Sequence, residues 1–139
     1  MTRNFRRQEF ACKGEHCCGH SAPISLVLVS GLQQLRDDLS AILGRDVVII
    51  VTSGFRCIRQ DLEEALRRGE TPDQRAARNS QHCLGTAADI LAPLAGPDLI
   101  EEIAEGIPAF RDGGLGRYTG SREQMVHLDV RGVRARWRD

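Results

Sequence analysis

The sequence predicts an α+β fold in which a small, mainly antiparallel sheet has flanking helices. Three observations support this prediction. Residues 24–43 carry an apolar stripe with helical spacing, residues 46–52 form a β-branched run of strand length, and residues 125–130 alternate between apolar and polar side chains. A chain of 139 residues suits one domain. We therefore expect residues 1–139 to form a single domain.

The overall composition excludes several classes of protein. The 19 basic residues equal the 19 acidic residues in number, so no excess of positive charge indicates binding to nucleic acid. No apolar run is long enough to span a membrane, and residues 1–8 lack the apolar core of a secretory signal. We therefore expect a protein that is made in the cytoplasm without a signal peptide, without membrane insertion and without a nucleic-acid partner.

Residues 1–23 are expected to be an irregular, cysteine-rich segment. Three cysteines and two histidines are interleaved within it: Cys12, His16, Cys17, Cys18 and His20. A disulfide or a small metal clip would pin this segment, and Cys57 is a candidate disulfide partner; alternatively, the thiols stay reduced. The odd total of cysteines leaves at least one thiol unpaired.

The first helix is predicted from Pro23 to Leu43. Its apolar residues recur at alternating steps of four and three: Leu28, Leu32, Leu35, Leu39 and Ile42. Ser21 is a plausible N-terminal cap, and Gly44 is expected to end the helix. This stripe should pack on the sheet.

The segment after this helix is predicted to lead into a functional site. Residues 46–52 are too uniformly apolar for an exposed edge, so we expect a central strand that delivers Ser53 to Arg56 to the site. Residues 59–68 should form a short charged helix that ends at Gly69. Residues 70–79 lack apolar periodicity and contain a proline, which indicates a surface loop over a cleft.

The stretch from Ser80 to Asp89 carries the first candidate metal ligands. A glycine turn between His82 and Asp89 allows both side chains to converge if the chain folds back. Asp89 lies in an apolar strand, where an unpaired carboxylate would be costly. His127 can add a third ligand. Three nitrogen or oxygen ligands with an open fourth position are typical of a catalytic zinc site.

The segment between these ligands is expected to contain a turn, a helix and a glycine-rich loop. Residues 93–97 should form the turn, and residues 98–106 the helix, which Pro108 ends. The glycines of residues 113–116 permit close backbone approach or positive φ. Tyr118 is then expected to project into the cleft.

The last strand is predicted from the alternation around His127. Val126, Leu128 and Val130 share one face, and His127 and Asp129 share the other. Residues 133–138 should pair back on this strand as a hairpin, through the turn at Arg131 and Gly132.

These motifs resemble those of the zinc peptidases in the D-Ala-D-Ala carboxypeptidase and murein endopeptidase superfamily, whose fold is shared with the hedgehog signalling domain. The resemblance lies in Ser-x-His-x-x-Gly-x-Ala-x-Asp from Ser80 to Asp89, followed by His-x-Asp from His127 to Asp129. Residues 53–56, residues 113–118 and the ending around Trp137 match as well. The similarity covers about residues 10–137, and the chain looks like a small, phage-lysin-like member.

The resemblance implies a zinc metallopeptidase of carboxypeptidase or endopeptidase type. Zn²⁺ would be held by His82, Asp89 and His127, and the substrate would be a peptide bond next to a D-amino acid in peptidoglycan stem peptides or cross-links. Arg56 would polarise the scissile carbonyl or hold a substrate carboxylate. Ser80 and Tyr118 would bind substrate. We expect a monomer that acts on the cell wall, in the periplasm or after release by lysis machinery.

One position departs from the superfamily pattern. Many members have an acidic residue three positions before the last histidine ligand, and Gln124 stands there in this chain. An amide is not a useful general base, so another group must accept the proton. Asp129 is the first candidate, either for this role or to orient His127, and Glu123 is the second.

Two other functions are compatible with the same residues. The first is a non-catalytic, zinc-containing module that binds the cell wall or another partner, as the hedgehog-like fold allows and as Gln124 favours. The second is a thiol peptidase that uses Cys83 with His127, although nothing beyond neighbouring histidines activates this thiol.

Overall fold

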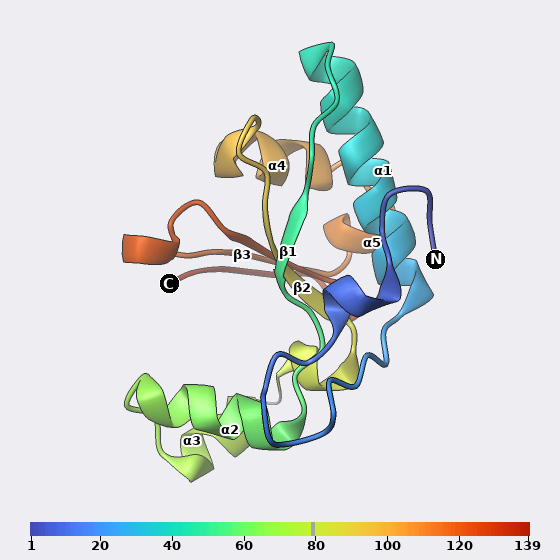
Figure 1. Cartoon of the computed structure of the whole chain (residues 1–139). Coiled ribbons are helices and arrows are strands. Elements are labelled where there is room, and N and C mark those ends of the chain that lie inside the picture. The colour runs from blue at the N-terminus through green and yellow to red at the C-terminus, as the bar shows by residue number, and fades with distance from the viewer. Residues whose placement is uncertain (79) are drawn as a thin grey trace.

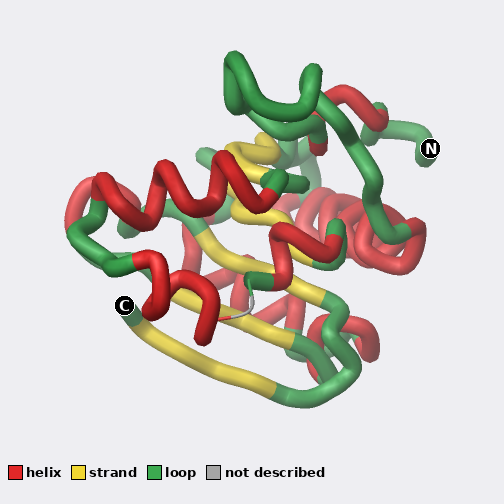
Figure 2. The backbone as a smooth tube through the Cα atoms, turned by 90° about the horizontal axis from the view of Figure 1, so that it is seen from below, coloured by secondary structure: helices red, strands yellow, loops and turns green. Residues whose placement is uncertain are grey.

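The structure, a computed structural model, describes residues 1–78 and 80–139. This part of the chain folds into a five-stranded sheet with helices on both sides (Figure 1). In Figure 2, α2 (Ile58–Arg67) and α3 (Pro72–Arg78) lie in front of the strands, whereas α1 (Leu26–Leu43) lies behind them. The predicted α+β class is confirmed. Among the described residues, no helix is both long and apolar enough to cross a bilayer.

The sheet has the strand order β1-β2-β4-β3-β5. The strands are β1 (Ile50–Ser53), β2 (Ala87–Leu91), β3 (Gly114–Arg117), β4 (Val126–Asp129) and β5 (Ala135–Arg138). Every neighbouring pair is antiparallel except β3 with β5, which is parallel. The neighbouring interior strands β2 and β4 carry two of the three predicted metal ligands, Asp89 and His127.

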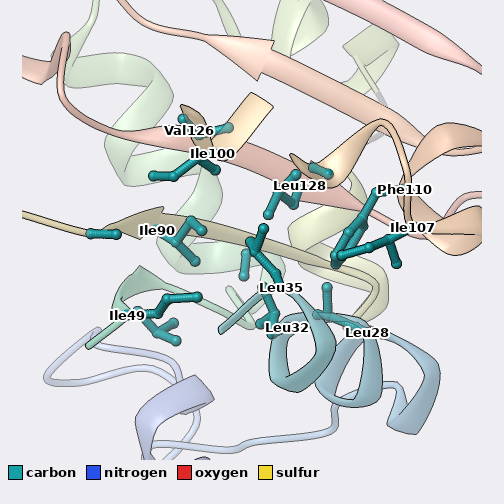
Figure 3. Close-up of a cluster of buried hydrophobic side chains, with 14 of the residues drawn as sticks. Leu28, Leu32, Leu35, Ile49, Ile90, Ile100, Ile107, Phe110, Val126 and Leu128 are labelled. Atoms are coloured by element: carbon teal, nitrogen blue, oxygen red, sulfur yellow. The ribbon is translucent and has the colours of Figure 1, made fainter. Parts of the chain in front are cut away.

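The hydrophobic core lies between α1 and one face of the sheet (Figure 3). Leu28, Leu32 and Leu35 of α1 point toward Ile90 of β2 and Leu128 of β4, and all of them are fully buried. Each such side chain contributes about 1.5–3 kcal/mol when it leaves water. The helix therefore holds one face of the sheet and leaves the opposite face for the site.

The boundaries of α1 agree with the prediction at its end but not at its start. Gly44 ends the helix in the left-handed conformation, with φ of 66°. Ser25, and not Ser21, caps the start, because its side chain accepts a hydrogen bond from the Leu28 amide. Ile42, predicted in the apolar stripe, is exposed.

The strand predicted at residues 46–52 is shorter and lies at an edge of the sheet. β1 begins at Ile50 and pairs only with β2. Val47, Ile49 and Val51 are buried, whereas Val48 and Ile50 are largely exposed. The run is therefore buried on one side only. Uniform apolarity wrongly predicted a central strand, because β-branched residues also suit the outer side of an edge strand.

The N-terminal segment, predicted to be irregular, contains a short helix and packs closely on the rest of the fold. It contains the short 3-10 helix η1 (Arg7–Phe10), and Phe5 and Phe10 are completely buried in the core. The Phe55 amide donates to the Phe10 carbonyl at 2.8 Å. A Cβ atom on Gly54 would lie 2.6 Å from the Phe10 Cα, so this contact requires glycine at that position.

Most of the loop predicted at residues 70–79 is helix α3, and Asn79 lies outside the described residues. Pro72 is the first residue of the helix, where a missing amide hydrogen costs nothing. Thr71 Oγ1 accepts from the Gln74 amide, and Gln74 Oε1 accepts from the Thr71 amide. This is a capping box. The sequence Thr-Pro-Asp-Gln therefore signals a helix start that outweighs the absence of an apolar stripe.

Two further elements between β2 and β4 differ from the prediction. The predicted helix at residues 98–106 is α4 (Gly96–Ala104), but Pro108 does not end it. Pro108 instead begins a short helix of its own, α5 (Pro108–Arg111), whose Phe110 is buried. The glycine-rich residues predicted as a loop form strand β3. Their lack of side chains leaves space for side chains of the neighbouring strands.

The C-terminal residues 135–138 do not form the predicted hairpin with β4. They form β5, which runs parallel to β3. Both sides of β4 are already occupied, by β2 and by β3, so the outer edge of β3 is the free hydrogen-bonding edge. Local sequence cannot reveal that the neighbouring edge is taken.

Candidate metal centre

The neighbouring strands β2 and β4 bring two candidate ligands together. Asp89 of β2 lies opposite His127 of β4 in the antiparallel register. Their side chains leave the sheet on the face opposite Ile90 and Leu128, because successive strand residues point to opposite faces. His127 Nδ1 lies 3.2 Å from Asp89 Oδ1. Both side chains are buried.

His82 reaches the same point from the 3-10 helix η2 (Gln81–Leu84), which precedes β2. Gly85 ends η2 with φ of 71°, a conformation that glycine adopts readily. His82 Nδ1 lies 2.7 Å from the Gly54 carbonyl oxygen. Because a carbonyl only accepts, Nδ1 carries a proton, and in the neutral ring the lone pair is on Nε2. This Nε2 lies 3.4 Å from Asp89 Oδ2.

The three side chains fit a metal ion. One ligand atom from each of His82, Asp89 and His127 lies within 4.8 Å of the others. His82 Nε2 is buried and has no hydrogen-bond partner among the described residues, a rare and costly state that a metal would relieve. Burial opposes the ionisation of Asp89, but the two histidines hold its pKa well below the ordinary range. Two imidazoles and one ionised carboxylate suit zinc.

Asp129 is attached to the other ring nitrogen of His127. Its Oδ2 lies 2.7 Å from His127 Nε2. The carboxylate also accepts from the Gly114 amide and from the amide and guanidinium of Arg131. Burial raises the pKa of Asp129, but the lowering by Arg131 and His127 is larger, so its pKa is well below the ordinary range. Asp129 is therefore a fixed anion that orients the His127 ring.

The glycines of β3 make room for this arrangement. Gly114 faces Asp129 across the sheet, and Gly116 faces His127. A Cβ atom at Gly114 would lie 2.1 Å from Asp129 Oδ2, and one at Gly116 would lie 2.1 Å from the Trp137 ring. The close approach predicted for this glycine-rich stretch is confirmed. The predicted alternative, a positive φ, is found at neither glycine.

Aromatic side chains form the wall beside the ligands. The Tyr118 hydroxyl donates to Asp89 Oδ1 at 2.7 Å. Burial and the charge of Asp89 raise the pKa of Tyr118 far above its ordinary value, so the phenol stays protonated. The Trp137 ring packs against both Tyr118 and His127, with centroids 5.2 and 5.3 Å away. The Arg122 guanidinium lies 4.3 Å from the centroid of the Tyr118 ring.

A cleft of about 710 Å³ opens above His82 and His127. Four arginines line it: Arg56, Arg68, Arg122 and Arg131. The carboxylates that line it are Glu70 and Asp139, each paired with one of these arginines. The other two arginines, Arg56 and Arg131, are held from outside the lining by Glu64 and Asp129. Among the lining residues themselves cations outnumber anions, which suits a substrate that carries carboxylates.

Arg56 lies in this cleft beside the ligands, as the prediction placed it. Its guanidinium is held by two carboxylates of α2, at 2.6 Å from Glu64 and 3.4 Å from Asp61. Burial lowers the pKa of Arg56, but Glu64 and Asp89 raise it more, so the side chain stays charged. Its backbone amide donates to the His82 carbonyl, which ties the loop of Arg56 to the ligand.

The other predicted site residues occupy different places. Ser80 lines the cleft beside His82. Glu123 and Gln124 are exposed, in the turn before β4, and neither is among the described residues that line the cleft. Asp129 is bonded to His127 but is not among the lining residues either.

Several residues that line the cleft were not predicted as site residues. They are Arg68, Glu70, Gln81, Arg122, Arg131 and Asp139. Gln81 was within reach of sequence reasoning, because it neighbours a predicted ligand. The others come from segments that only the fold brings to the site, and isolated charged residues carry no local signal of function.

Cys83 is not placed for the thiol chemistry that was one alternative. Its sulfur accepts a hydrogen bond from Arg75 at 3.3 Å. Burial and the charge of Asp61 raise the pKa of Cys83, despite the opposing effect of Arg75. A protonated thiol is a poor nucleophile, so the geometry favours metal chemistry at His127.

Comparison with known proteins gives one match. A family model described as peptidoglycan L,D-endopeptidase MepK, of the Peptidase_M15_2 family, matches residues 20–137. The matched range includes His82, Asp89, His127 and the described residues that line the cleft, except Asp139. No curated protein and no solved structure matches the chain.

Proposed function

The chain belongs to the peptidase family of the peptidoglycan L,D-endopeptidase MepK, and from this premise we propose that it is a zinc-dependent endopeptidase that cleaves peptide cross-links of peptidoglycan. Membership of this family makes it a peptidoglycan-hydrolysing metallopeptidase in general terms. The observation that carries the zinc assignment is the buried cluster of His82, Asp89 and His127, in which His82 Nε2 has no hydrogen-bond partner among the described residues.

We propose that Zn²⁺ is held by His82 Nε2, a carboxylate oxygen of Asp89 and His127 Nδ1. The remaining nitrogens of the two histidines support this assignment, because each is bonded to an oxygen, at Gly54 and at Asp129. When bound, zinc would supply a Lewis acid for the scissile carbonyl and would acidify a water molecule. Tyr118 would keep its proton and hold Asp89 in the ligating orientation.

The substrate side of the proposal depends on the cleft. Its arginines suit the free carboxylates of peptidoglycan peptides, which retain such groups after cross-linking. Arg56 would face the charge that develops on the carbonyl oxygen, since α2 holds its guanidinium near the ligands. Ser80 and Tyr118 would contact the peptide. The endopeptidase type, rather than a carboxypeptidase, is supported by the family description.

The proton acceptor in this proposal is a carboxylate of the cleft. Asp129 would act as a positioning residue, because its oxygens already accept from His127, Gly114 and Arg131. We assign the role of proton acceptor to Glu70, which lines the cleft, and not to Glu123, which is exposed in the turn. A comparison of Glu70→Gln with Glu123→Gln at saturating zinc tests this assignment. Glu70→Gln should lose activity and Glu123→Gln should keep it. If both variants keep the activity of the wild type, Glu70 is not the proton acceptor.

The experiment that tests the function measures products from purified, cross-linked peptidoglycan. Mass spectrometry of the soluble peptides should show cleavage at cross-links that starts with zinc, stops with a chelator and resumes when zinc is added again. His82→Ala should be inactive while remaining folded by circular dichroism. Zinc binding without any product would reject the peptidase and support the non-catalytic binding module instead.

A further inference from the structure

A second cluster of metal-ligating side chains lies in the N-terminal part of the fold. Cys12, Cys17 and Cys18 come from the segment before α1, and Cys57 is the N-cap residue of α2. The sulfur atoms of these four residues all lie within 4.8 Å of one another. Cys12 is buried and the other three are half-buried. The cluster shares no residue with the site described above.

The distances within this cluster match a tetrahedral thiolate site. Cys12 Sγ lies 3.8 Å from both Cys17 Sγ and Cys57 Sγ, and Cys17 Sγ lies 3.8 Å from Cys18 Sγ. Four sulfurs at about 2.3 Å from a zinc ion are about 3.8 Å apart along the edges of the tetrahedron. A disulfide instead requires about 2.05 Å between two sulfurs, and it would leave the other two unused.

The surrounding backbone is shaped around the sulfurs. A Cβ atom on Gly14 would lie 2.6 Å from Cys17 Sγ, so glycine keeps this side of the cluster open. The Gln60 amide donates to Cys57 Sγ at 3.4 Å, and the Gly14 and Cys57 amides point to the Cys12 sulfur. Backbone donors of this kind stabilise the negative charge of metal-bound thiolates.

We propose that Cys12, Cys17, Cys18 and Cys57 bind a second, structural Zn²⁺ ion. The four ligands close the coordination sphere, so this ion would have no position for a substrate. Its role would be to fasten the N-terminal segment to the start of α2. The loop between β1 and α2 contains Gly54, whose carbonyl holds His82, and Arg56, which lines the cleft. The structural ion would thus stabilise the loop that positions the first candidate site.

Metal analysis of the full chain after exhaustive dialysis tests this proposal. The expected result is about two equivalents of zinc in the wild type and about one in both Cys12→Ser and Cys57→Ser. Cys83→Ser is the matched control, since Cys83 is the cysteine outside the cluster and should keep two equivalents. His82→Ala should lose the other ion and keep the sulfur-bound one, which separates this proposal from the peptidase assignment.

Measurements on the wild-type chain remove any dependence on how well the cysteine variants fold. Replacement of zinc by Co²⁺ should give the intense visible bands of tetrahedral cobalt thiolate, and these should persist in His82→Ala. A thiol-specific mercurial should release one of the two zinc equivalents. Cobalt spectra without thiolate bands would overturn the proposal. A disulfide would also overturn it. Denatured protein prepared without reductant would then have a lower mass and fewer free thiols than the fully reduced chain.

Discussion

At the scale of single residues, His127 shows how a fold assigns separate roles to the two nitrogens of one ring. Nδ1 faces Asp89 and the candidate metal position, whereas Nε2 lies against Asp129. Asp129 is in turn held by Arg131 through two guanidinium hydrogen bonds. The ring orientation is therefore set by a chain of charged partners that ends at the rim of the cleft.

The first prediction concerns Asp129→Asn. An amide weakens the support of His127 and loses the ionic contacts with Arg131, so zinc affinity should fall about 10- to 100-fold. Turnover at saturating zinc should stay within about tenfold of the wild type, because a positioning residue does not accept the proton. Zinc titration and steady-state kinetics separate the two quantities. A loss of about 100-fold or more in kcat with unchanged zinc affinity would make Asp129 the general base.

The second prediction concerns Arg56→Lys. The variant should bind zinc normally but lose about 100-fold in kcat/KM, because a single ammonium cannot bond Glu64 and face the substrate as the guanidinium fork does. Arg59→Lys, on the exposed side of the same helix, is the control and should be fully active. Equal activity of the two variants would mean that Arg56 serves only to hold α2.

At the scale of elements, strand β3 owes its sequence to its neighbours. The Asp129 side chain of β4 occupies the space beside Gly114, and the Trp137 ring of β5 occupies the space beside Gly116. Neither glycine has positive φ. The requirement is therefore one of space rather than of backbone conformation, and any side chain here would push against the partners of His127.

The third prediction concerns Gly114→Ala. The added Cβ would lie 2.1 Å from Asp129 Oδ2, so Asp129 must move. Overpacking of this kind should lower the free energy of unfolding by about 1–3 kcal/mol and should weaken zinc binding. Gly106→Ala is the matched control, because its nearest atom is 3.4 Å away. Urea denaturation and zinc titration of both variants provide the check, and two indistinguishable variants would contradict the role of β3.

At the scale of the whole molecule, metal binding joins segments that are distant in the sequence. The candidate ligands come from η2, β2 and β4, which α1 supports from the opposite face. An ion that binds only the folded chain adds stability according to its concentration and affinity, about 2.7 kcal/mol at 100 times the dissociation constant. The metal content should therefore affect the unfolding of the entire domain.

The fourth prediction is that this stabilisation decreases in acid. Burial lowers the pKa of His127 in the metal-free protein, but Asp129 and Asp89 raise it above its ordinary value of about 6.5. Protons therefore compete with zinc for His127 at a higher pH than they would at an ordinary histidine. The stabilisation by zinc should be complete well above the pKa of His127 and should decline as the pH falls below it. Melting temperatures with and without zinc, compared at pH 8 and pH 6, measure the effect.

His82→Ala is the control for this measurement, because it removes the zinc that binds at His127 and retains any zinc bound to the cysteines. The part of the pH-dependent zinc stabilisation that arises at His127 should be absent in this variant, and any part that remains belongs to zinc bound by the cysteine thiolates. A shift in melting temperature that is as large at pH 6 as at pH 8 in the wild type would contradict the prediction.

The sequence by itself determined the fold class, and it predicted the helix that the structure has at Leu26–Leu43 and the candidate ligands His82, Asp89 and His127. These features depend on local properties: apolar spacing, the alternation of strand residues and a motif with a glycine turn. Tertiary structure decided what local patterns cannot encode. It placed β1 at an edge, β5 beside β3, Asp129 behind His127 rather than in the cleft, and Cys57 beside three distant cysteines. Each outcome depends on which neighbouring edges and volumes are already filled, and that is a property of the packed whole.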